Sequence, residues 1–393
     1  MKRIASCTCC GSAAVRIFHT VEDVPVNSVL ALDSREEAVN FPTGTIALGF
    51  CPDCGFIFNT AFDTALTEYS ERYDPTQAFS GTFNRWHRAL AEDVVERFGL
   101  QGKRVIEIGC GKGEFLHLLA EVGDVEGVGF DPSYEASRDA EAQHEKLSFV
   151  ADFYSEKYAD VKGDAVCCKM TLEHISPAES FMGSVRKAIG DHPETIVFFQ
   201  VPDVRRILDE AAFWDIYYEH CSYYSAGSLA RLFRRAGFDV HDVRREYGEQ
   251  YLMISARPAG EEPTPALPEE GDLEELGQQV ERFAGRLDQI RSEWGSLLGA
   301  SRERGDRTVI WGSGSKGVSF LTTIGRDAGI EYAVDINTFR HGQHMLVTGQ
   351  KIVSPEFLVE YKPDRVIVMN PVYKDEIEEQ LRSLGLAPEV LAL

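Results

Sequence analysis

The chain has 393 residues, and its 40 Lys and Arg against 63 Asp and Glu give a formal net charge of −23 at pH 7. This acidic excess argues against an electrostatic nucleic-acid binder, which needs a basic surface to displace counterions, but it leaves room for a local basic pocket. With 44% hydrophobic and 26% charged residues the chain is not disordered as a whole, and its length favours about two to three domains.

The N-terminal sequence MKRIASCTCC shows no apolar segment typical of a secretory signal, and no apolar run reaches the about 18 residues that a membrane span needs. We therefore expect a cytoplasmic protein that has neither a membrane nor a nucleic acid as a partner. The nine cysteines are an odd number, so thiols or metal ligands are favoured over disulfides.

Two CxxC pairs mark a small N-terminal module, predicted over residues 1–80. Cys7 and Cys10 form the first pair, Cys51 and Cys54 form the second, and a glycine follows each pair. The glycine lets the backbone turn so that its amides face the thiolates, and four sulfurs can then surround one tetrahedral Zn²⁺. Because protein would fill all four positions, such a zinc is structural. Buried free thiols or a redox pair are the alternatives, and Cys9 is a spare thiol.

Predicted strands and helices alternate over residues 81–258, which is typical of a doubly wound α/β domain. A helix at 86–98 leads to a strand at 104–108, a glycine-rich turn and a helix at 114–120. Further strands and helices complete the pattern. The strands are expected at 125–130, 165–168, 196–201, 240–243 and 251–256, and the helices at 177–189 and 228–236.

The turn after the first strand reads EIGCGKG, from Glu107 through Gly109 and Gly111 to Gly113, and Asp131 ends the next strand. Glycines let a chain turn tightly and approach a ligand, and an acid after the second strand can take two ribose hydroxyls. These features alone would allow NAD. However, Glu107 would repel a pyrophosphate, and the spacing ExGxGxG differs from the GxGxxG of dinucleotide sites.

This turn resembles motif I of the class I S-adenosylmethionine (SAM)-dependent methyltransferases. The resemblance implies that SAM is the cofactor and that residues in and after the turn contact it: Glu107, Gly109, Gly111, Gly113, Asp131, Asp152, Phe153 and Lys169. His174, in the sequence LEHI, also fits methyltransferase sequences, although a histidine that only begins a helix is an equal alternative. We expect core positions for the remaining cysteines of this region, Cys110, Cys167 and Cys168.

Residues 213–225, FWDIYYEHCSYYS, are dense in groups that can move protons. One interpretation is a base with an orienting carboxylate and a phenol, and the other is an aromatic loop packed over the core.

The order of these motifs resembles, over nearly the whole chain, the three-domain sugar C-methyltransferases of deoxysugar biosynthesis. Those enzymes act on nucleotide-linked 4-ketohexoses: a base removes the proton next to the ketone, and the enolate attacks the SAM methyl. The resemblance implies that His220 is the base and that Glu219 orients it or stabilises charge. It also implies tyrosines at the sugar: Tyr217 and Tyr73 as hydrogen-bond partners of the sugar or its enolate oxygen, and Tyr218 and Tyr223 as substrate contacts.

A Pro- and Glu-rich segment at 258–271 predicts a linker, and a long helix follows it within the region 259–304. Apolar residues recur there every three or four positions: Leu273, Leu276, Val280, Phe283, Leu287, Ile290, Trp294 and Leu297. We expect this stripe to pack onto the protein's own domains, and a dimeric coiled coil is the alternative. The chain is therefore expected to be a monomer or a homodimer.

A second α/β unit is predicted over residues 305–393. Its turn, GSGSKG at 312–317, fits GxGxxG, and Asp335 ends the next strand. Spacing alone would allow NAD, and a degenerate half that only packs is another interpretation. The family resemblance implies instead that Lys316 and Asp335 face an anionic acceptor. Three further side chains would add local positive charge: Arg340, His341 and His344.

The predicted fold class is α/β: a zinc-binding module, a class I methyltransferase domain with a Rossmann-like sheet and a C-terminal Rossmann-like domain. The predicted function is SAM-dependent C-methylation of an activated keto-sugar, an NDP-4-keto-deoxyhexose. Two alternatives stay open. One is methylation of a non-nucleotide small molecule at C, O or N, and the other is an NAD-dependent oxidoreductase or a nucleotide-binding scaffold.

Overall fold

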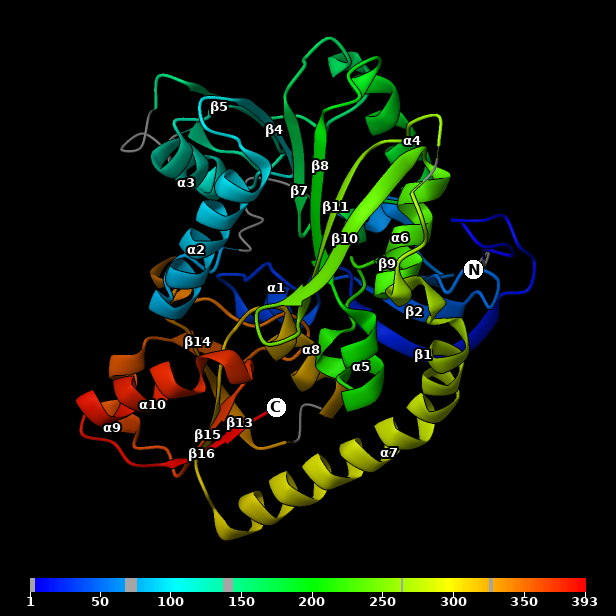
Figure 1. The fold of residues 1–393 in the computed structure, drawn as a ribbon. Helices are drawn as coiled ribbons and strands as arrows, with labels where there is room; N and C mark the ends of the chain where they lie inside the picture. The colour runs from blue at the N-terminus through cyan, green and yellow to red at the C-terminus, as the bar shows by residue number, and fades with distance from the viewer. Residues whose placement is uncertain (1–3, 68–75, 137–143, 263, 325–327) are drawn as a thin grey trace.

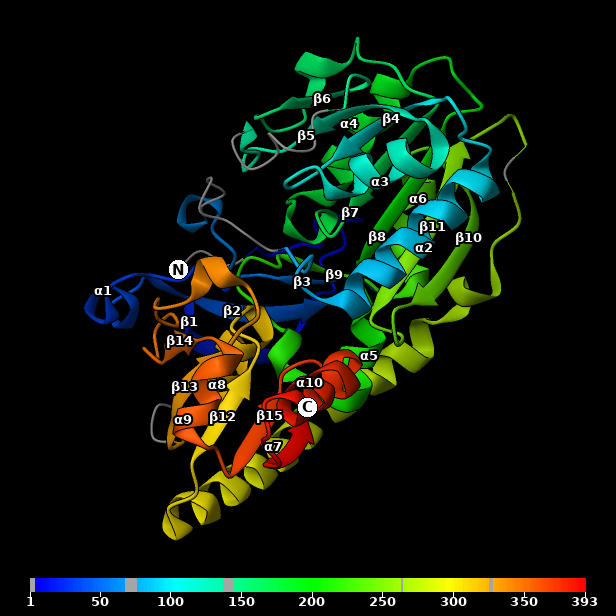
Figure 2. The same ribbon diagram turned by 90° about the vertical axis from the view of Figure 1, so that its left-hand side faces the viewer.

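A computed structural model describes residues 4–67, 76–136, 144–262, 264–324 and 328–393. The described residues form three β-sheets of four, seven and five strands. Figure 1 and Figure 2 show the seven-stranded sheet at the top, the four-stranded sheet in the middle and the five-stranded sheet at the bottom. The three sheets therefore follow one another from top to bottom in these views.

The four-stranded antiparallel sheet joins the N-terminal module to the segment that carries His220. Its order is β1 (Arg16–Pro25), β2 (Thr43–Phe50), β3 (Ile57–Asn59) and β9 (Ser222–Tyr223), and the short helix α1 (Arg35–Val39) lies between β1 and β2 in the chain. Ile57 of β3 pairs with Tyr223 of β9. Residues of the module also share an apolar cluster with the seven-stranded sheet, as expected for a module whose own core is thin.

The seven-stranded sheet has the order β10-β11-β8-β7-β4-β5-β6. Its strands are β4 (Arg104–Ile108), β5 (Glu126–Phe130), β6 (Leu147–Val150), β7 (Ala165–Lys169), β8 (Ile196–Pro202), β10 (Phe238–Glu246) and β11 (Tyr251–Pro258). Strands β4 to β8 are parallel to their neighbours, whereas β11 and β10 are antiparallel. The predicted strands are confirmed, and β6 is an additional one.

Helices cover both faces of this sheet. On one face, α2 (Gly81–Phe98) and α3 (Glu114–Gly123) bury Val105 and Cys167, and on the other, α4 (Ala178–Ile189) and α6 (Ala226–Arg235) bury Ile106 and Cys168. Because neighbouring residues of a strand face opposite sides, the parallel strands are apolar along their length. The strand order reverses at β4, and such reversals open a crevice at the carboxyl ends of the strands.

The five-stranded sheet is parallel throughout and has the order β14-β13-β12-β15-β16. Its elements are β12 (Thr308–Trp311), α8 (Ser315–Ile324), β13 (Ile330–Val334), β14 (Lys351–Val353), α9 (Leu358–Tyr361), β15 (Arg365–Val368), α10 (Lys374–Ser383) and β16 (Glu389–Ala392). In chain order this is 3-2-1-4-5, the arrangement of a Rossmann-like sheet. The second glycine turn links β12, its central strand, to α8.

The long helix α7 (Leu273–Arg304) runs along the lower edge of the molecule (Figure 1). Its apolar stripe packs against α5 (Val204–Glu210), α8 and β1, with the ring of Phe283 5.8 Å from that of Phe18 and the ring of Trp294 5.2 Å from that of Phe320. The stripe therefore packs onto the protein's own domains, as predicted.

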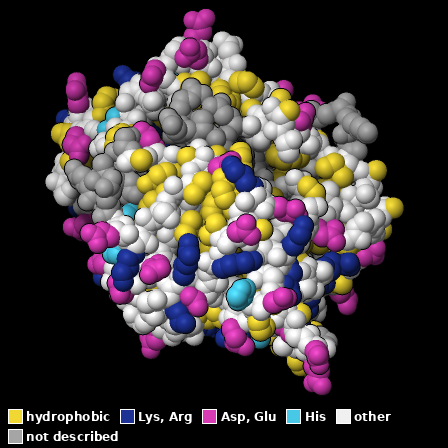
Figure 3. All heavy atoms as spheres, turned by 90° about the horizontal axis from the view of Figure 1, so that it is seen from above, with side chains coloured by type: hydrophobic (Ala, Val, Ile, Leu, Met, Phe, Trp, Pro, Cys, Tyr) yellow, Lys and Arg dark blue, Asp and Glu magenta, His cyan; other side chains and the backbone are white. Residues whose placement is uncertain are grey.

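No helix of the described residues combines the length and the apolar character that crossing a membrane requires. On the face drawn in Figure 3, outside the grey atoms, Lys and Arg side chains alternate with Asp and Glu side chains. Positive charge on this face is thus dispersed rather than gathered into a basic stripe.

Candidate active site between the two glycine turns

A cavity of about 600 Å³ lies where the seven-stranded sheet meets the five-stranded sheet. Its wall includes the first glycine turn at 109–112, the second glycine turn at 312–317, and Tyr217 and His220 from the segment between the sheets. This volume is within the range of small-molecule sites. Two turns that are far apart in the sequence therefore face one cavity, and the predicted base lies in the same wall.

The first turn needs glycine for two different reasons. Gly109, Gly111 and Gly113 have φ angles of 72°, 55° and 87°, which L side chains rarely adopt. A Cβ on Gly109 would lie 2.0 Å from Thr171 Oγ1, and one on Gly113 would lie 2.7 Å from the Phe149 ring, whereas one on Gly111 would meet nothing within 4 Å. Gly109 and Gly113 thus allow close packing, while Gly111 leaves open space for a ligand.

Glu107 and Lys169 place opposite charges beside this turn, at the ends of the adjacent strands β4 and β7. Glu107 is 2% exposed, burial raises its pKa to about 7, and its Oε2 has no hydrogen-bond partner. Lys169 Nζ lies 2.7 Å from His87 Nε2 and 3.9 Å from the centre of the Phe115 ring, and burial lowers its pKa. An acid and an amine in one wall suit the ammonium and carboxylate of an amino-acid ligand such as the methionine end of SAM.

Asp131 and Phe153 also lie in the cavity wall. Asp131 ends β5, and its carboxylate is held by the N–H groups of Gly111 at 2.9 Å and Ser133 at 2.7 Å. Phe153 is 60% exposed, so its ring is free to stack on a planar group. These positions fit the ribose and the adenine of SAM.

Two predicted cofactor residues lie outside the wall. Asp152 is not part of the cavity wall. Its carboxylate accepts hydrogen bonds from the Tyr158 hydroxyl at 2.6 Å and from Lys157 Nζ at 3.0 Å. Gly113 is the N-cap of α3 and is likewise not part of the cavity wall.

His220 is 8% exposed and lies in the cavity wall. The centre of its ring is 4.7 Å from that of His174 and 4.7 Å from that of Tyr217, both in edge-to-face contact. Burial, reinforced by His174, lowers the pKa of His220 well below its ordinary value. The imidazole is therefore neutral at pH 7 and has a lone pair that can accept a proton.

Tyr217 is held by a buried charge cluster. Its hydroxyl donates to Asp215 Oδ1 at 2.7 Å, and Asp215 also pairs with Lys316 and Arg206. Burial alone would raise the pKa of Asp215, but the two cations together hold it well below its usual range. Because Lys316 belongs to α8, the cluster ties the second glycine turn to the predicted catalytic segment.

The other predicted groups of this segment point elsewhere. Glu219 is 1% exposed and outside the cavity wall, and its Oε1 accepts hydrogen bonds from Ser28, including one from the backbone N–H at 2.8 Å. Its role in orienting His220 stays a prediction. Tyr218 and Tyr223 are also outside the wall: the Tyr218 hydroxyl accepts from the Asp63 N–H at 3.0 Å, and the Tyr223 hydroxyl donates to the Tyr217 carbonyl at 3.2 Å.

Tyr73 lies outside the described residues. Of the predicted acceptor groups, Lys316, Asp335 and Arg340 are in the wall, whereas His341 and His344 are not. Asp335 accepts from the N–H groups of Ser313 at 2.9 Å and Asn337 at 2.8 Å. At the second turn, a Cβ on Gly317 would lie 2.3 Å from the carbonyl oxygen of Gly312, so this glycine is needed for close helix–strand packing.

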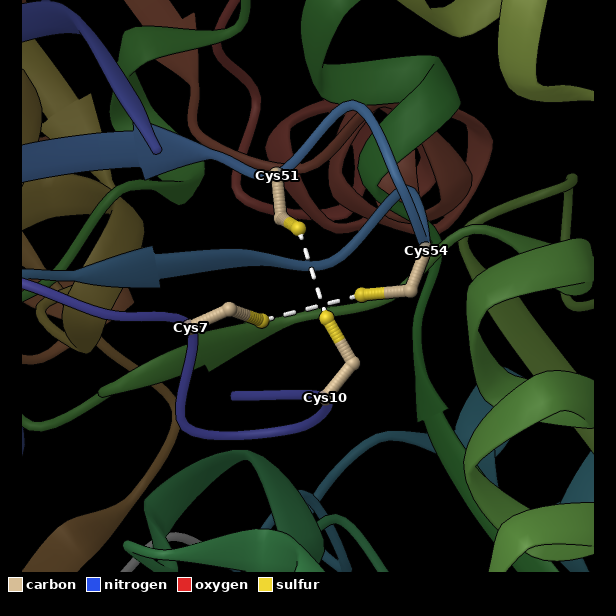
Figure 4. A group of neighbouring side chains, drawn as sticks. All are labelled: Cys7, Cys10, Cys51 and Cys54. Carbon is tan, nitrogen blue, oxygen red and sulfur yellow. Dashed lines mark hydrogen bonds between the residues drawn. The ribbon is translucent and has the colours of Figure 1, made fainter. Parts of the chain in front are cut away.

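The four predicted zinc ligands meet at one point, with their sulfurs within 4.8 Å of one another (Figure 4). The Sγ atoms of Cys7 and Cys54 are 3.6 Å apart, as are those of Cys10 and Cys51. Tetrahedral Zn–S bonds of about 2.3 Å place sulfurs about 3.8 Å apart, so the donor set and its spacing fit a zinc ion. Cys9 is buried but is not one of the four, and the three cysteines expected in the core are buried.

The structure adds residues that the sequence did not single out. Asp215 and Arg206 complete the cluster at Tyr217, and Glu173 lies beside His174 and His220 in the cavity wall. A signal existed for two of them, because Asp215 lies in the FWDIYYEH segment and Glu173 in the LEHI segment.

Two segments of the chain match known protein families. The family described as "Methyltransferase domain" matches residues 83–243, and that described as "C-methyltransferase C-terminal domain" matches residues 268–386. The chain is 27% identical over 313 residues to the C-methyltransferase NovU of Streptomyces niveus, a match that covers 76% of this chain and 74% of that protein. It is 26% identical over 211 residues to a ubiquinone biosynthesis O-methyltransferase of Neisseria meningitidis, covering 48% of this chain and 86% of that protein.

Among solved structures, the 1,6-didemethyltoxoflavin-N1-methyltransferase of Burkholderia thailandensis, with bound S-adenosylhomocysteine, aligns with a TM-score of 0.36 at 16% identity, covering 53% of this chain and 97% of that one. Taken together, the sequence matches show that the chain is a SAM-dependent methyltransferase, with a class I methyltransferase domain and a C-terminal segment that matches the model of the C-methyltransferase C-terminal domain.

Proposed function

We propose that the protein transfers the SAM methyl group to a carbon next to the ketone of an activated keto-sugar, an NDP-4-keto-deoxyhexose. The observation that carries this proposal is one cavity whose wall contains both glycine turns and neutral His220. The match to a C-methyltransferase C-terminal domain and the similarity to NovU, a C-methyltransferase, support carbon as the methylated atom. The choice of a keto-sugar follows the resemblance of the 213–225 segment.

A proton next to a ketone is weakly acidic, so its removal needs a base and a group that supports the enolate. In this proposal His220 accepts the proton on a ring nitrogen, and the electron pair of the C–H bond passes into the enolate. SAM, held by the first glycine turn with Glu107 and Asp131, would supply the sulfonium methyl to the enolate carbon, with S-adenosylhomocysteine as the leaving group. Tyr217, fixed by Asp215, is placed beside His220 to contact the sugar or its enolate oxygen.

The second turn suits the anionic end of such an acceptor. The amide-rich start of α8, at 314–316, lies in the cavity wall together with the side chains of Lys316 and Arg340. Backbone N–H groups at a helix start attract phosphate, and a lysine adds a point charge. An acceptor without a nucleotide, methylated at C, O or N, is the alternative, and it would leave these groups unused. The methyltransferase identity replaces the oxidoreductase alternative.

We also propose one structural zinc per chain, held by the four cysteines shown in Figure 4. All four positions are filled by protein, so the ion would have no open position for substrate. The zinc would fix the N-terminal module, whose β3 strand pairs with β9 just after His220.

Thermal unfolding with dTDP, UDP and GDP, each with and without S-adenosylhomocysteine, tests the acceptor class. We expect a saturable rise in Tm with one nucleotide, and a larger rise when both ligands are present, because ligands that bind only the folded state stabilise it. A rise with S-adenosylhomocysteine and with none of the nucleotides would contradict a nucleotide-sugar acceptor and favour a smaller acceptor.

A further inference from the structure

Another acidic side chain, Glu173, lies beside the proposed base. Glu173 belongs to the short 3-10 helix Leu172–His174, which follows β7, and it is 1% exposed in the cavity wall. One of its carboxyl oxygens and one ring nitrogen from each of His174 and His220 all lie within 4.8 Å of one another. The three groups therefore form one cluster that opens to the cavity.

Both carboxyl oxygens of Glu173 lack a hydrogen-bond partner. A buried carboxyl group without partners is costly, and native structures retain few of them without a functional reason. Burial raises the pKa of Glu173 to about 8, so this group changes charge within the pH range in which enzymes work. Its position and its unmet hydrogen bonds both point to an interaction that forms during the reaction.

The reaction creates a charge that needs such a group. When His220 accepts the substrate proton it becomes an imidazolium buried away from water, which is unfavourable without a nearby negative charge. Asp215 already pairs with Lys316 and Arg206, and Glu219 is bonded to Ser28. Glu219 Oε2 also lacks a hydrogen-bond partner, but among the described residues Glu173 is the acid grouped with His220 for which neither carboxyl oxygen has one.

We propose that Glu173 is the carboxylate partner of His220: it stabilises the imidazolium formed by proton abstraction and then receives that proton. This inference rests on the proposed role of His220 as the base. The proton passes from the substrate carbon to His220 and from His220 to Glu173, while the electron pair of the C–H bond stays in the enolate. Glu173 acts through His220 and is therefore a positioning residue.

The ionisable groups around Glu173 leave its own titration distinct. His174, with a pKa lowered to about 4 by burial, and His220 stay neutral above pH 7. From the other elements, burial raises the pKa of Cys221 and of Tyr251 to about 12 and keeps those of Cys168 and Tyr224 well above their ordinary values. Asp215 and Lys316 face His220 as a fixed ion pair. Burial also raises the pKa of Glu219, next to His220, to about 7. A charge change near pH 8 is therefore assigned to Glu173 by its loss in Glu173→Gln and its persistence in Glu219→Gln.

The first test needs no substrate. In protein labelled with ¹³C at histidine, the ring signal of His220, assigned by its loss in His220→Asn, is followed by NMR from pH 6 to pH 9. We expect a shift with a midpoint near pH 8 that disappears in Glu173→Gln, returns with a moved midpoint in Glu173→Asp and persists in the matched control Glu219→Gln. A step that survives Glu173→Gln, or that only Glu219→Gln removes, overturns the proposal.

A second test follows the reaction. With dTDP-4-keto-6-deoxyglucose in D₂O, exchange at the carbon next to the ketone should accelerate as pH rises through about 8. Glu173→Gln should lose this rise, with a rate at pH 9 reduced at least about tenfold, and should keep its Tm increase with S-adenosylhomocysteine. Absence of exchange in the unaltered enzyme would count against the keto-sugar proposal instead, and the NMR titration would still decide the role of Glu173.

A divalent cation is the rival occupant of this cluster, because two histidines and a carboxylate also bind metals. Metal analysis of the unaltered protein, after equilibration with Zn²⁺ or Mn²⁺ and desalting, separates the two. About one zinc per chain in both the unaltered protein and Glu173→Gln is the expected result. A second metal that only the unaltered protein retains would overturn the proposal.

Discussion

The two glycine turns, at 109–113 and 312–317, have the same backbone setting and different chemical surroundings. Each links the middle one of five parallel strands to a helix, and each has an acid directly after the next strand, Asp131 in one and Asp335 in the other. Beside the first turn, buried Glu107 is the next-to-last residue of β4, whereas Lys316 is the second residue of the helix after the second turn. One turn therefore has a buried acid beside it, and the other has an amine that pairs with Asp215.

This difference teaches that glycine spacing predicts a tight turn but not the ligand. The GxGxxG spacing of the second turn alone would suggest NAD, and the first turn alone would allow it as well. In the function proposed here, the charged side chains nearby distinguish a site for a cationic cofactor from one for an anionic acceptor. Both turns face one cavity that also contains His220, so a different ligand at each turn would bring the two ligands to the same base.

The largest effect is expected for His220→Asn, which removes the base and leaves both turns intact. Methyl transfer and exchange at the carbon next to the ketone should fall about 10²- to 10⁴-fold, the usual contribution of a general base. The Tm increases produced by S-adenosylhomocysteine and by the stabilising nucleotide should persist. Methyl transfer at the unaltered rate by this variant would rule out His220 as the base.

Loss of the proposed zinc should lower the stability of the protein and weaken methyl transfer. Cys51→Ser should lose the zinc and lower Tm, because metal binding contributes directly to folding in small metal modules. Since β3 of the module pairs with β9 after His220, methyl transfer should also weaken. Metal analysis and thermal unfolding measure these effects, and Gly295→Ala, where a Cβ meets nothing within 4 Å, is the control for a harmless substitution. A zinc content that Cys51→Ser leaves unchanged would contradict the four-cysteine site.

Two matched glycine variants should separate the ligands. Gly109→Ala forces a Cβ to within 2.0 Å of Thr171 at a φ of 72°, a strain of roughly 1–3 kcal/mol or more, and should weaken S-adenosylhomocysteine binding. Gly317→Ala places a Cβ 2.3 Å from the Gly312 carbonyl and should weaken only nucleotide binding. Calorimetric titration of both ligands checks this. If each variant weakened both ligands equally, the two turns would not have separate roles.

The smallest effect is a pH dependence at the first turn. Burial raises the pKa of Glu107 to about 7, so this acid is neutral below that pH and charged above it. The charged form attracts the ammonium of S-adenosylhomocysteine, and the Kd should therefore fall as pH rises from 6 to 8, by less than about tenfold. Glu107→Gln should abolish this trend in calorimetric titrations at several pH values. A trend that persists in Glu107→Gln would assign it to another group.

Local patterns predicted the seven-stranded and five-stranded sheets, the long helix and the cluster of four cysteines, because each depends on residues close in sequence or on a fixed spacing. The pairing of β3 with β9 was not predictable, since it joins short segments that lie far apart in the chain. The direction in which each side chain of the 213–225 segment points could not be predicted from the sequence either. His220 faces the cavity whereas Glu219 bonds Ser28, and the sequence EH does not distinguish these two outcomes.

The choice between Glu219 and Glu173 shows the same limit. Both acids directly precede a histidine, Glu173 before His174 and Glu219 before His220. Sequence reasoning paired His220 with its neighbour in the chain, while the structure places Glu173 beside it through contact between separate elements. Contacts of this kind depend on tertiary packing and require a structure.

The central claim is that methyl transfer from SAM goes to carbon in an acceptor held by the second turn. Its most direct test is ¹³C NMR of the product formed from methyl-labelled SAM and a 4-keto-6-deoxyhexose attached to the nucleotide that raises Tm. We predict a labelled methyl signal bonded to a sugar carbon next to the ketone. A signal from an O-methyl or N-methyl group, or no transfer to any nucleotide-linked keto-sugar, would contradict the account.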